Sequence, residues 1–170
     1  MSNSPALVAG SGNDSNQTPS SDGVNISFYH LTSTPMQRAL PKLLEKIVGS
    51  GHRALVVTSS EEEAEQLNQL LWTYDQDSFL PHGSLKDGRA EDQPILLSSE
   101  AKPLNNANIL LITHGQMAEQ TERFERVLDM FDGNNAEAVA AARTRWTVYK
   151  NAGHTLTYQQ QTAAGGWEQK

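Results

Sequence analysis

The side chains best suited to metal binding or acid–base chemistry are scattered widely along this chain. The five histidines lie at positions 30, 52, 82, 114 and 154, and no two of them are three to five residues apart. A metal site would therefore have to assemble its ligands from distant segments. The chain has no cysteine, which excludes a thiol nucleophile, a disulfide framework and a cysteine-based zinc site. We predict no metal site and no bound cofactor.

Nucleotide or hydrolase chemistry would require glycine-rich turns that the sequence lacks. The loop after the first predicted strand, residues 31–35, contains no glycine that would let backbone N–H groups approach a pyrophosphate. No P-loop and no Gly-x-Ser-x-Gly motif occurs, and residues 49–52 are interpreted as a turn. Asp87, Glu91 and Asp92 fall in an acidic loop, where solvation explains them. We assign no catalytic residue; a small α/β nucleotide-binding enzyme remains the alternative function.

Two large aromatic residues, Trp72 and Phe79, lie close together in the sequence without a catalytic or metal-binding group beside them. Leu67, Leu71 and Tyr74 fall within about 60° on a predicted helix, and Trp72 points about 100° away from Leu71. Trp72 therefore either packs at the edge of the core beneath the following loop or contacts a partner together with Phe79. Tryptophan is common at the energetic centres of protein interfaces.

The C-terminal helix, residues 134–151, combines aromatic and basic residues on one face. Val139, Arg143, Trp146 and Lys150 fall within about 60° of one another. Such a face suits a peptide that carries an aromatic or aliphatic group beside carboxylates, because arginine can bind a carboxylate with two hydrogen bonds. The alternative is a solvated Arg/Lys face with Trp146 in the core.

The same helix has a local excess of positive charge in an acidic protein. Arg143, Arg145 and Lys150 stand against Glu137 alone, a balance of +2, whereas the whole chain carries −7. A separate side of the helix carries small residues that we expect to pack against a sheet: Ala138, Ala141 and Val148.

The elements that position these residues follow from local sequence signals. Apolar runs predict strands at 26–31, 53–58, 94–98 and 108–113 and a last short strand at 154–160, whereas 124–131 is ambiguous between strand and helix. Thr34 is predicted to cap one helix, with Pro35 at its first position and Gln37 in a capping box. Ser60 and Glu63 form a second capping box, and residues 49–51 end the first helix.

Proline 41 lies inside the first predicted helix and removes one backbone hydrogen bond. We therefore expect either a kink or a later helix start at Pro41. His82 follows a proline in the loop after Trp72, and we expect its side chain to order that turn through a hydrogen bond.

The order of elements predicts an α/β fold: a single domain with a mixed, mostly parallel sheet flanked by helices, Rossmann-like but without a nucleotide-binding loop. Residues 25–160 form this domain. Residues 1–24 are rich in Ser, Asn, Gly and Asp and are predicted to be a disordered tail, and residues 161–170 a loose C-terminal tail.

The charge and apolar pattern limit the partners. Proteins that bind DNA directly usually carry a basic surface, so a net charge of −7 predicts only indirect contact with DNA. Direct binding of single-stranded DNA is a third possibility, which a steep salt dependence would reveal. No stretch approaches the roughly 18 apolar residues of a membrane span. We expect a cytoplasmic protein without membrane contact.

Seven groups of residues, in order and spacing, resemble the chi subunit of bacterial DNA polymerase III. The resemblance covers about residues 25–157 and is carried by residues 28–31, 39–46 with 51–53, 70–72, 78–83, 94–98, 124–127 and 142–153. It implies a non-catalytic accessory protein of the clamp-loader assembly, in which residues 124–131 form a strand.

The resemblance also implies two partners. One is the psi subunit, in a heterodimer through Trp72, Phe79, Leu80 and Pro81. The other is the acidic C-terminal tail of single-stranded DNA-binding protein, which ends in an aromatic residue. Its contacts are implied to be Arg143, Trp146, Lys150, Phe131 and Val139. Val139 and Thr147 stand where some members carry lysine, so the tail is expected to depend more on Arg143 and Lys150.

Overall fold

The computed structural model describes residues 23–170 except positions 76, 78 and 119. The predicted disordered tail, residues 1–24, lies almost wholly outside the described residues. The helices are α1 (Met36–Gly49), α2 (Glu61–Thr73) and α3 (Ala136–Asn151). The strands are β2 (Asn25–Leu31), β3 (Ala54–Val57), β4 (Gly83–Ser84), β5 (Ile95–Ser98), β6 (Ile109–Ile112), β7 (Arg126–Asp132), β8 (Thr155–Gln161) and β9 (Trp167–Gln169).

In the described part of the chain, the strands form one sheet in the order β4-β5-β3-β6-β7-β2-β8-β9. All neighbours are parallel except β8 and β9. The predicted α/β class with a mixed, mostly parallel sheet is confirmed. The ambiguous segment 124–131 contains strand β7, as the resemblance implied.

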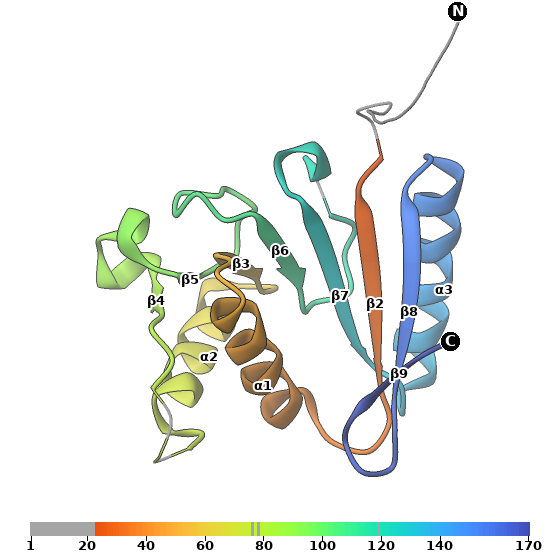
Figure 1. Ribbon diagram of the computed structural model, residues 1–170, viewed down its shortest axis with the longest axis horizontal. Coiled ribbons are helices and arrows are strands. Elements are labelled where there is room, and N and C mark those ends of the chain that lie inside the picture. Colours follow the sequence, from red (N-terminus) through yellow and green to blue (C-terminus); the bar gives the residue numbers. More distant parts are fainter. Residues whose placement is uncertain (1–22, 76, 78, 119) are drawn as a thin grey trace, which may run out of the picture.

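Helices cover both faces of the sheet (Figure 1), with α1 and α2 on one face and α3 on the other. Side chains of the central strands alternate between two apolar clusters, as the period of a strand requires. On β7, Leu128 and Met130 join the cluster beneath α1 and α2, whereas Val127 and Phe131 join the cluster beneath α3. The central strands are buried on both faces, which explains their continuous apolar runs.

The first helix begins one residue later than predicted. Pro35 is the N-cap of α1 and not its first helical residue, and no side chain caps this end. The proposed Thr34 capping box was therefore wrong, because the Thr34 hydroxyl accepts a hydrogen bond from Gln161 Nε2 at 2.7 Å instead. The helix includes Pro41 and ends at Gly49, and Gly51 follows with φ +86°, a conformation that favours glycine.

The second helix begins as its sequence predicts. The Ser60 side chain accepts a hydrogen bond from the Glu63 backbone N–H at 3.1 Å, which confirms Ser60 as the N-cap. The returning bond differs slightly, because the Glu63 carboxylate accepts from the backbone N–H of Ser59 at 3.1 Å. The acidic first turn also complements the helix dipole.

The C-terminal residues form a hairpin, so the prediction of a loose tail over 161–170 was wrong. Strand β9 pairs with the end of β8, and the Trp167 ring packs on Tyr29 with 5.0 Å between ring centroids. The buried Gln161 side chain closes the loop after β2: its Oε1 accepts from the backbone N–H groups of three consecutive residues at 3.0–3.1 Å, namely Thr32, Ser33 and Thr34. A carboxamide at the end of β8 thus satisfies three donors that no secondary structure pairs.

Among the described residues, no helix has the length and apolar character needed to span a membrane.

Candidate functional site

A cavity of about 350 Å³ opens between α3 and the edge of the sheet formed by β7, β2 and β8. We call it the α3 cavity. Its lining residues are Phe28, His30, Phe131, Val139, Ala142, Arg143, Trp146, Thr147 and Tyr158. Four of the five residues predicted to bind a tail peptide are therefore brought together here. The fifth, Lys150, is exposed one helical turn beyond Trp146 and does not line the cavity.

Aromatic rings form the apolar part of this cavity. Phe28 lies beneath Trp146, with 5.4 Å between ring centroids, and Phe131 and Tyr158 flank the same pair. Trp146 is only partly buried, so its indole closes part of the floor while remaining accessible. Trp146 also packs against the apolar cluster beneath α3, so the core contact of the alternative interpretation is present together with the cavity. The cavity is large enough for an aromatic side chain.

Arg143 supplies the positive charge at the cavity. Its side chain is exposed, and no carboxylate among the described residues lies within ion-pair distance of it. A guanidinium without a protein partner can bind a carboxylate with two hydrogen bonds. The Arg143 cation and the aromatic floor of the cavity together match the chemistry of an acidic peptide that carries an aromatic residue.

Arg145 has a different role from the one its sequence position indicated. It is 4% exposed and donates from Nε and Nη2 to the two carboxylate oxygens of Asp129, at 2.7 and 2.9 Å. Its Nη1 donates to the Gly115 carbonyl at 2.8 Å. The excess of +2 in the helix sequence is therefore not all available to a ligand, because the Arg145 charge is neutralised inside the protein. Burial raises the pKa of Asp129, and the hydrogen bonds from Arg145 oppose that shift.

The buried side of α3 also differs from the prediction. Ala142, Arg145 and Tyr149 face the sheet, whereas Val148 and Ala141 are exposed and Ala138 is only partly buried. The small-residue side was therefore wrongly predicted to pack on the sheet. Helical spacing alone could not separate the two sides, because the buried side contains an arginine whose partner lies on another element.

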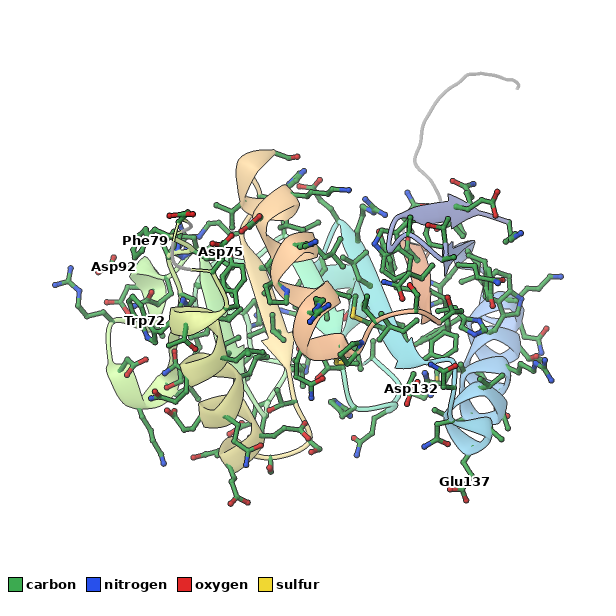
Figure 2. All side chains as sticks on the ribbon, turned by 90° about the horizontal axis from the view of Figure 1, so that it is seen from below. Trp72, Asp75, Phe79, Asp92, Asp132 and Glu137 are labelled. Atoms are coloured by element: carbon green, nitrogen blue, oxygen red, sulfur yellow. The ribbon has the colours of Figure 1, made fainter. Side chains whose placement is uncertain are left out.

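A second exposed surface lies at the other end of the molecule. Trp72 is 55% exposed and Phe79 is 73% exposed, with 6.1 Å between their ring centroids. We call these two side chains the Trp72 patch. Figure 2 shows both beside α2, with Glu137 of α3 at the opposite end. The loop after α2 contacts Trp72 through the rings of Phe79 and His82, but more than half of the Trp72 surface stays exposed.

Three residues follow Phe79 in its loop: Leu80 and Pro81, which were predicted to share the surface of Phe79, and His82. Leu80 is 3% exposed and belongs to the core, so it supports the Trp72 patch without forming part of it, and Pro81 is partly buried. His82 contacts the Leu80 carbonyl at 2.6 Å and the Asn68 carbonyl at 3.1 Å, which confirms that His82 orders this turn. Its ring also lies 4.7 Å from the Trp72 ring.

Comparison with known proteins now identifies the family. The sequence model described as DNA polymerase III chi subunit, HolC, matches residues 24–157. The chain belongs to the DNA polymerase III chi subunit family. A probable DNA polymerase III subunit chi from Rickettsia prowazekii (strain Madrid E) is 32% identical over 113 residues, covering 62% of this chain and 68% of the relative. The DNA polymerase III subunit chi of Escherichia coli (strain K12) is 26% identical over 140 residues, covering 78% and 95%.

Membership of the chi family confirms the resemblance and places the protein in DNA replication as a subunit of polymerase III. The match includes every residue predicted to bind a partner but ends at residue 157. Tyr158, Gln161 and β9 lie beyond it, so their roles rest on the structure. The sequence prediction also missed His30 as a cavity residue; its alternation with Phe28 on one strand face was the available signal.

This chi-family chain has another cavity, of about 340 Å³, between α1 and α2 near the carboxyl ends of β3 and β6. Nucleotides bind at such positions in many doubly wound folds. Glu63 is the one charged side chain among the described residues that line it, so the cavity offers no cation to a phosphate. In the described part of the chain, no group of three His, Asp or Glu residues is placed to hold a metal ion.

Proposed function

We propose that this chi-family subunit is a non-catalytic, cytoplasmic adaptor of the clamp-loader assembly. The α3 cavity binds the acidic C-terminal tail of single-stranded DNA-binding protein, and the Trp72 patch binds the psi subunit in a heterodimer. Contact with DNA is then indirect. Because one domain holds both partners, it raises the effective concentration of each partner near the other without new chemistry.

The observation that carries the tail assignment is the exposed Arg143 beside an aromatic-floored cavity. The aromatic end of the tail fills the cavity against Trp146 and Phe131, and its carboxylates meet Arg143. Lys150, outside the cavity, contributes longer-range attraction that salt screens. The net charge of −7 gives the rest of the protein no comparable attraction for an acidic segment.

The Trp72 patch supports the psi assignment through exposure of large apolar rings. Two neighbouring aromatic side chains that both remain more than half exposed are typical of a partner surface. The patch lies at the opposite end of the molecule from helix α3 (Figure 2), which lines the cavity, so both partners can bind at once.

The alternative of a nucleotide-binding enzyme is opposed by the loop after β2. Its three backbone N–H groups, at Thr32, Ser33 and Thr34, already donate to Gln161 Oε1 and are not directed at an empty phosphate site. A nucleotide titration tests this alternative, since micromolar binding would favour an enzyme. Steep salt dependence of binding to single-stranded DNA would instead favour direct contact.

We expect Arg143→Ala to weaken binding of a synthetic acidic peptide with a C-terminal phenylalanine by about tenfold or more, because one charge-assisted contact contributes about 1.5–3 kcal/mol. Isothermal titration calorimetry measures the affinity. Lys42→Ala is the matched control: it removes one exposed charge from α1, on the other face of the sheet, and should leave the affinity unchanged. An unchanged affinity in Arg143→Ala would reject this face of α3 as the tail site.

We expect Phe79→Ala to weaken psi binding by about tenfold or more while tail-peptide binding stays intact, because a buried aromatic contributes about 1.5–3 kcal/mol. Co-purification with psi and calorimetry measure the two activities separately. Leu104→Ala, which removes another exposed apolar side chain elsewhere, should change neither. Equal loss of both activities in Phe79→Ala would indicate misfolding or one shared site and contradict the two-site proposal.

A further inference from the structure

A histidine forms part of the wall of the α3 cavity. His30 lies on β2 beside Phe131, with 4.9 Å between ring centroids, and it lines the cavity together with Arg143 and Tyr158. An imidazole can gain a positive charge near neutral pH. A histidine beside an anion-binding arginine can therefore change the affinity of the cavity for an anion as the pH changes.

The two ring nitrogens of His30 face different groups. Nδ1 forms a hydrogen bond with the Tyr158 hydroxyl. Nε2 lies against Gly133, so closely that a Cβ at this glycine would come within 2.1 Å of it. Only a residue without a side chain fits there, so Gly133 leaves room for the ring. We place the hydrogen of the neutral ring on Nε2, so that Nδ1 accepts a hydrogen bond from the Tyr158 hydroxyl.

The charged groups around His30 come from each neighbouring element. On α3, Arg143 opposes protonation, and burial of the ring does so more strongly; together they lower the pKa of His30. On β7, Asp129 points to the same side of the sheet as Phe131, and its carboxylate is already paired with Arg145. On β8, burial raises the pKa of Tyr158, which keeps the hydroxyl neutral, and Lys170 lies within electrostatic range of that hydroxyl. The His30 ring is therefore neutral in the free protein at neutral pH.

We propose that His30 and Tyr158 form, with Arg143, a three-residue anion site in which binding of a peptide carboxylate is coupled to proton uptake by His30. This inference rests on the proposed tail-binding function and concerns how the same cavity is regulated. When a carboxylate enters beside Arg143, the imidazole takes one proton from solvent at Nδ1. The new N–H donates to the Tyr158 oxygen, and the hydroxyl hydrogen, released from Nδ1, turns to the bound carboxylate.

The pH dependence follows from this change in partners. A bound carboxylate favours the imidazolium, so the pKa of His30 is higher in the complex than in the free protein. Between these two pKa values, binding takes up a proton. Affinity therefore rises as the pH falls through the pKa of the complex, and it levels off below the pKa of the free protein. A difference of about one pKa unit gives up to about tenfold in affinity.

Calorimetry with the acidic, phenylalanine-terminated peptide tests the coupling at pH 5.5, 6.5 and 7.5, each in two buffers of different ionisation enthalpy. We expect binding to be about three- to tenfold tighter at pH 5.5 than at pH 7.5, with net proton uptake on binding. His30→Gln should remove both the pH dependence and the proton uptake. Tyr158→Phe should weaken binding more at pH 5.5 than at pH 7.5, because the hydroxyl donates to the ligand only when His30 is protonated.

Controls separate this coupling from damage to the fold and from failure of the proposed function. His52→Gln replaces a partly buried histidine outside the cavity and should retain the pH dependence. Titration of the His30 ring by NMR, with and without peptide, measures the coupling in the wild-type protein, and equal pKa values in both states would overturn the inference. If the peptide binds through Arg143 with the same affinity at every pH, the inference fails and the proposed function stands. If no peptide binds at any pH, both fail.

Discussion

Arg145→Met should lower the free energy of unfolding by about 3–5 kcal/mol, because it leaves a buried carboxylate without its partner. Asp129 is 1% exposed and receives two hydrogen bonds from Arg145. The same guanidinium holds the Gly115 carbonyl, so the substitution also releases the loop after β6. Denaturant unfolding monitored by circular dichroism measures the loss. Arg143→Met, an identical change two residues away at an exposed position, should cost less than about 1 kcal/mol.

The pH dependence of the Arg145→Met variant provides a second check. Without the arginine, burial of Asp129 is unopposed, so its pKa in the folded protein rises further above the unfolded value. The folded variant then binds a proton that the unfolded chain releases, and its stability falls as the pH rises through the folded pKa. The deficit relative to wild type should therefore be larger at about pH 8 than at about pH 5. A deficit independent of pH would mean that Asp129 stays ionised without Arg145.

A double variant distinguishes a lost ion pair from lost packing. Asp129→Leu together with Arg145→Met replaces both charges by apolar groups, and we expect it to recover most of the stability lost in Arg145→Met. If the double variant is as unstable as the single one, the contact with Gly115, rather than the carboxylate, accounts for the effect.

Gln161→Ala should lower the free energy of unfolding by about 2–3 kcal/mol, because three backbone N–H groups lose their common acceptor. Gln161→Glu keeps an acceptor oxygen at the same reach and should cost less than about 1 kcal/mol. Gln160→Ala, next to it in β8, is the matched control. Thermal unfolding ranks the variants, and hydrogen exchange at residues 32–34 should accelerate in Gln161→Ala alone. Equal losses in Gln160→Ala and Gln161→Ala would show that general weakening of β8 is responsible.

The predictions that depend on neighbours in the sequence were mostly confirmed. Ser60 caps α2 because its hydroxyl reaches an N–H three residues ahead, and the apolar runs in β3 and β6 become strands because they are buried on both faces. The grouping of Val139, Arg143 and Trp146 around one cavity follows from helical periodicity alone. The Thr34 cap failed because Gln161, 127 residues away, binds the same hydroxyl.

What the sequence by itself determined is the class of fold, the family and the aromatic and basic face of α3, since these depend on local spacing. The tertiary structure alone decided which cations remain available to a ligand. Arg143 and Arg145 are alike in sequence, but β7 places Asp129 opposite only Arg145. It also decided that His30 and Tyr158 meet across β2 and β8, and that Gln161 closes the loop after β2. Such pairings depend on strand order, which no local pattern of residues encodes.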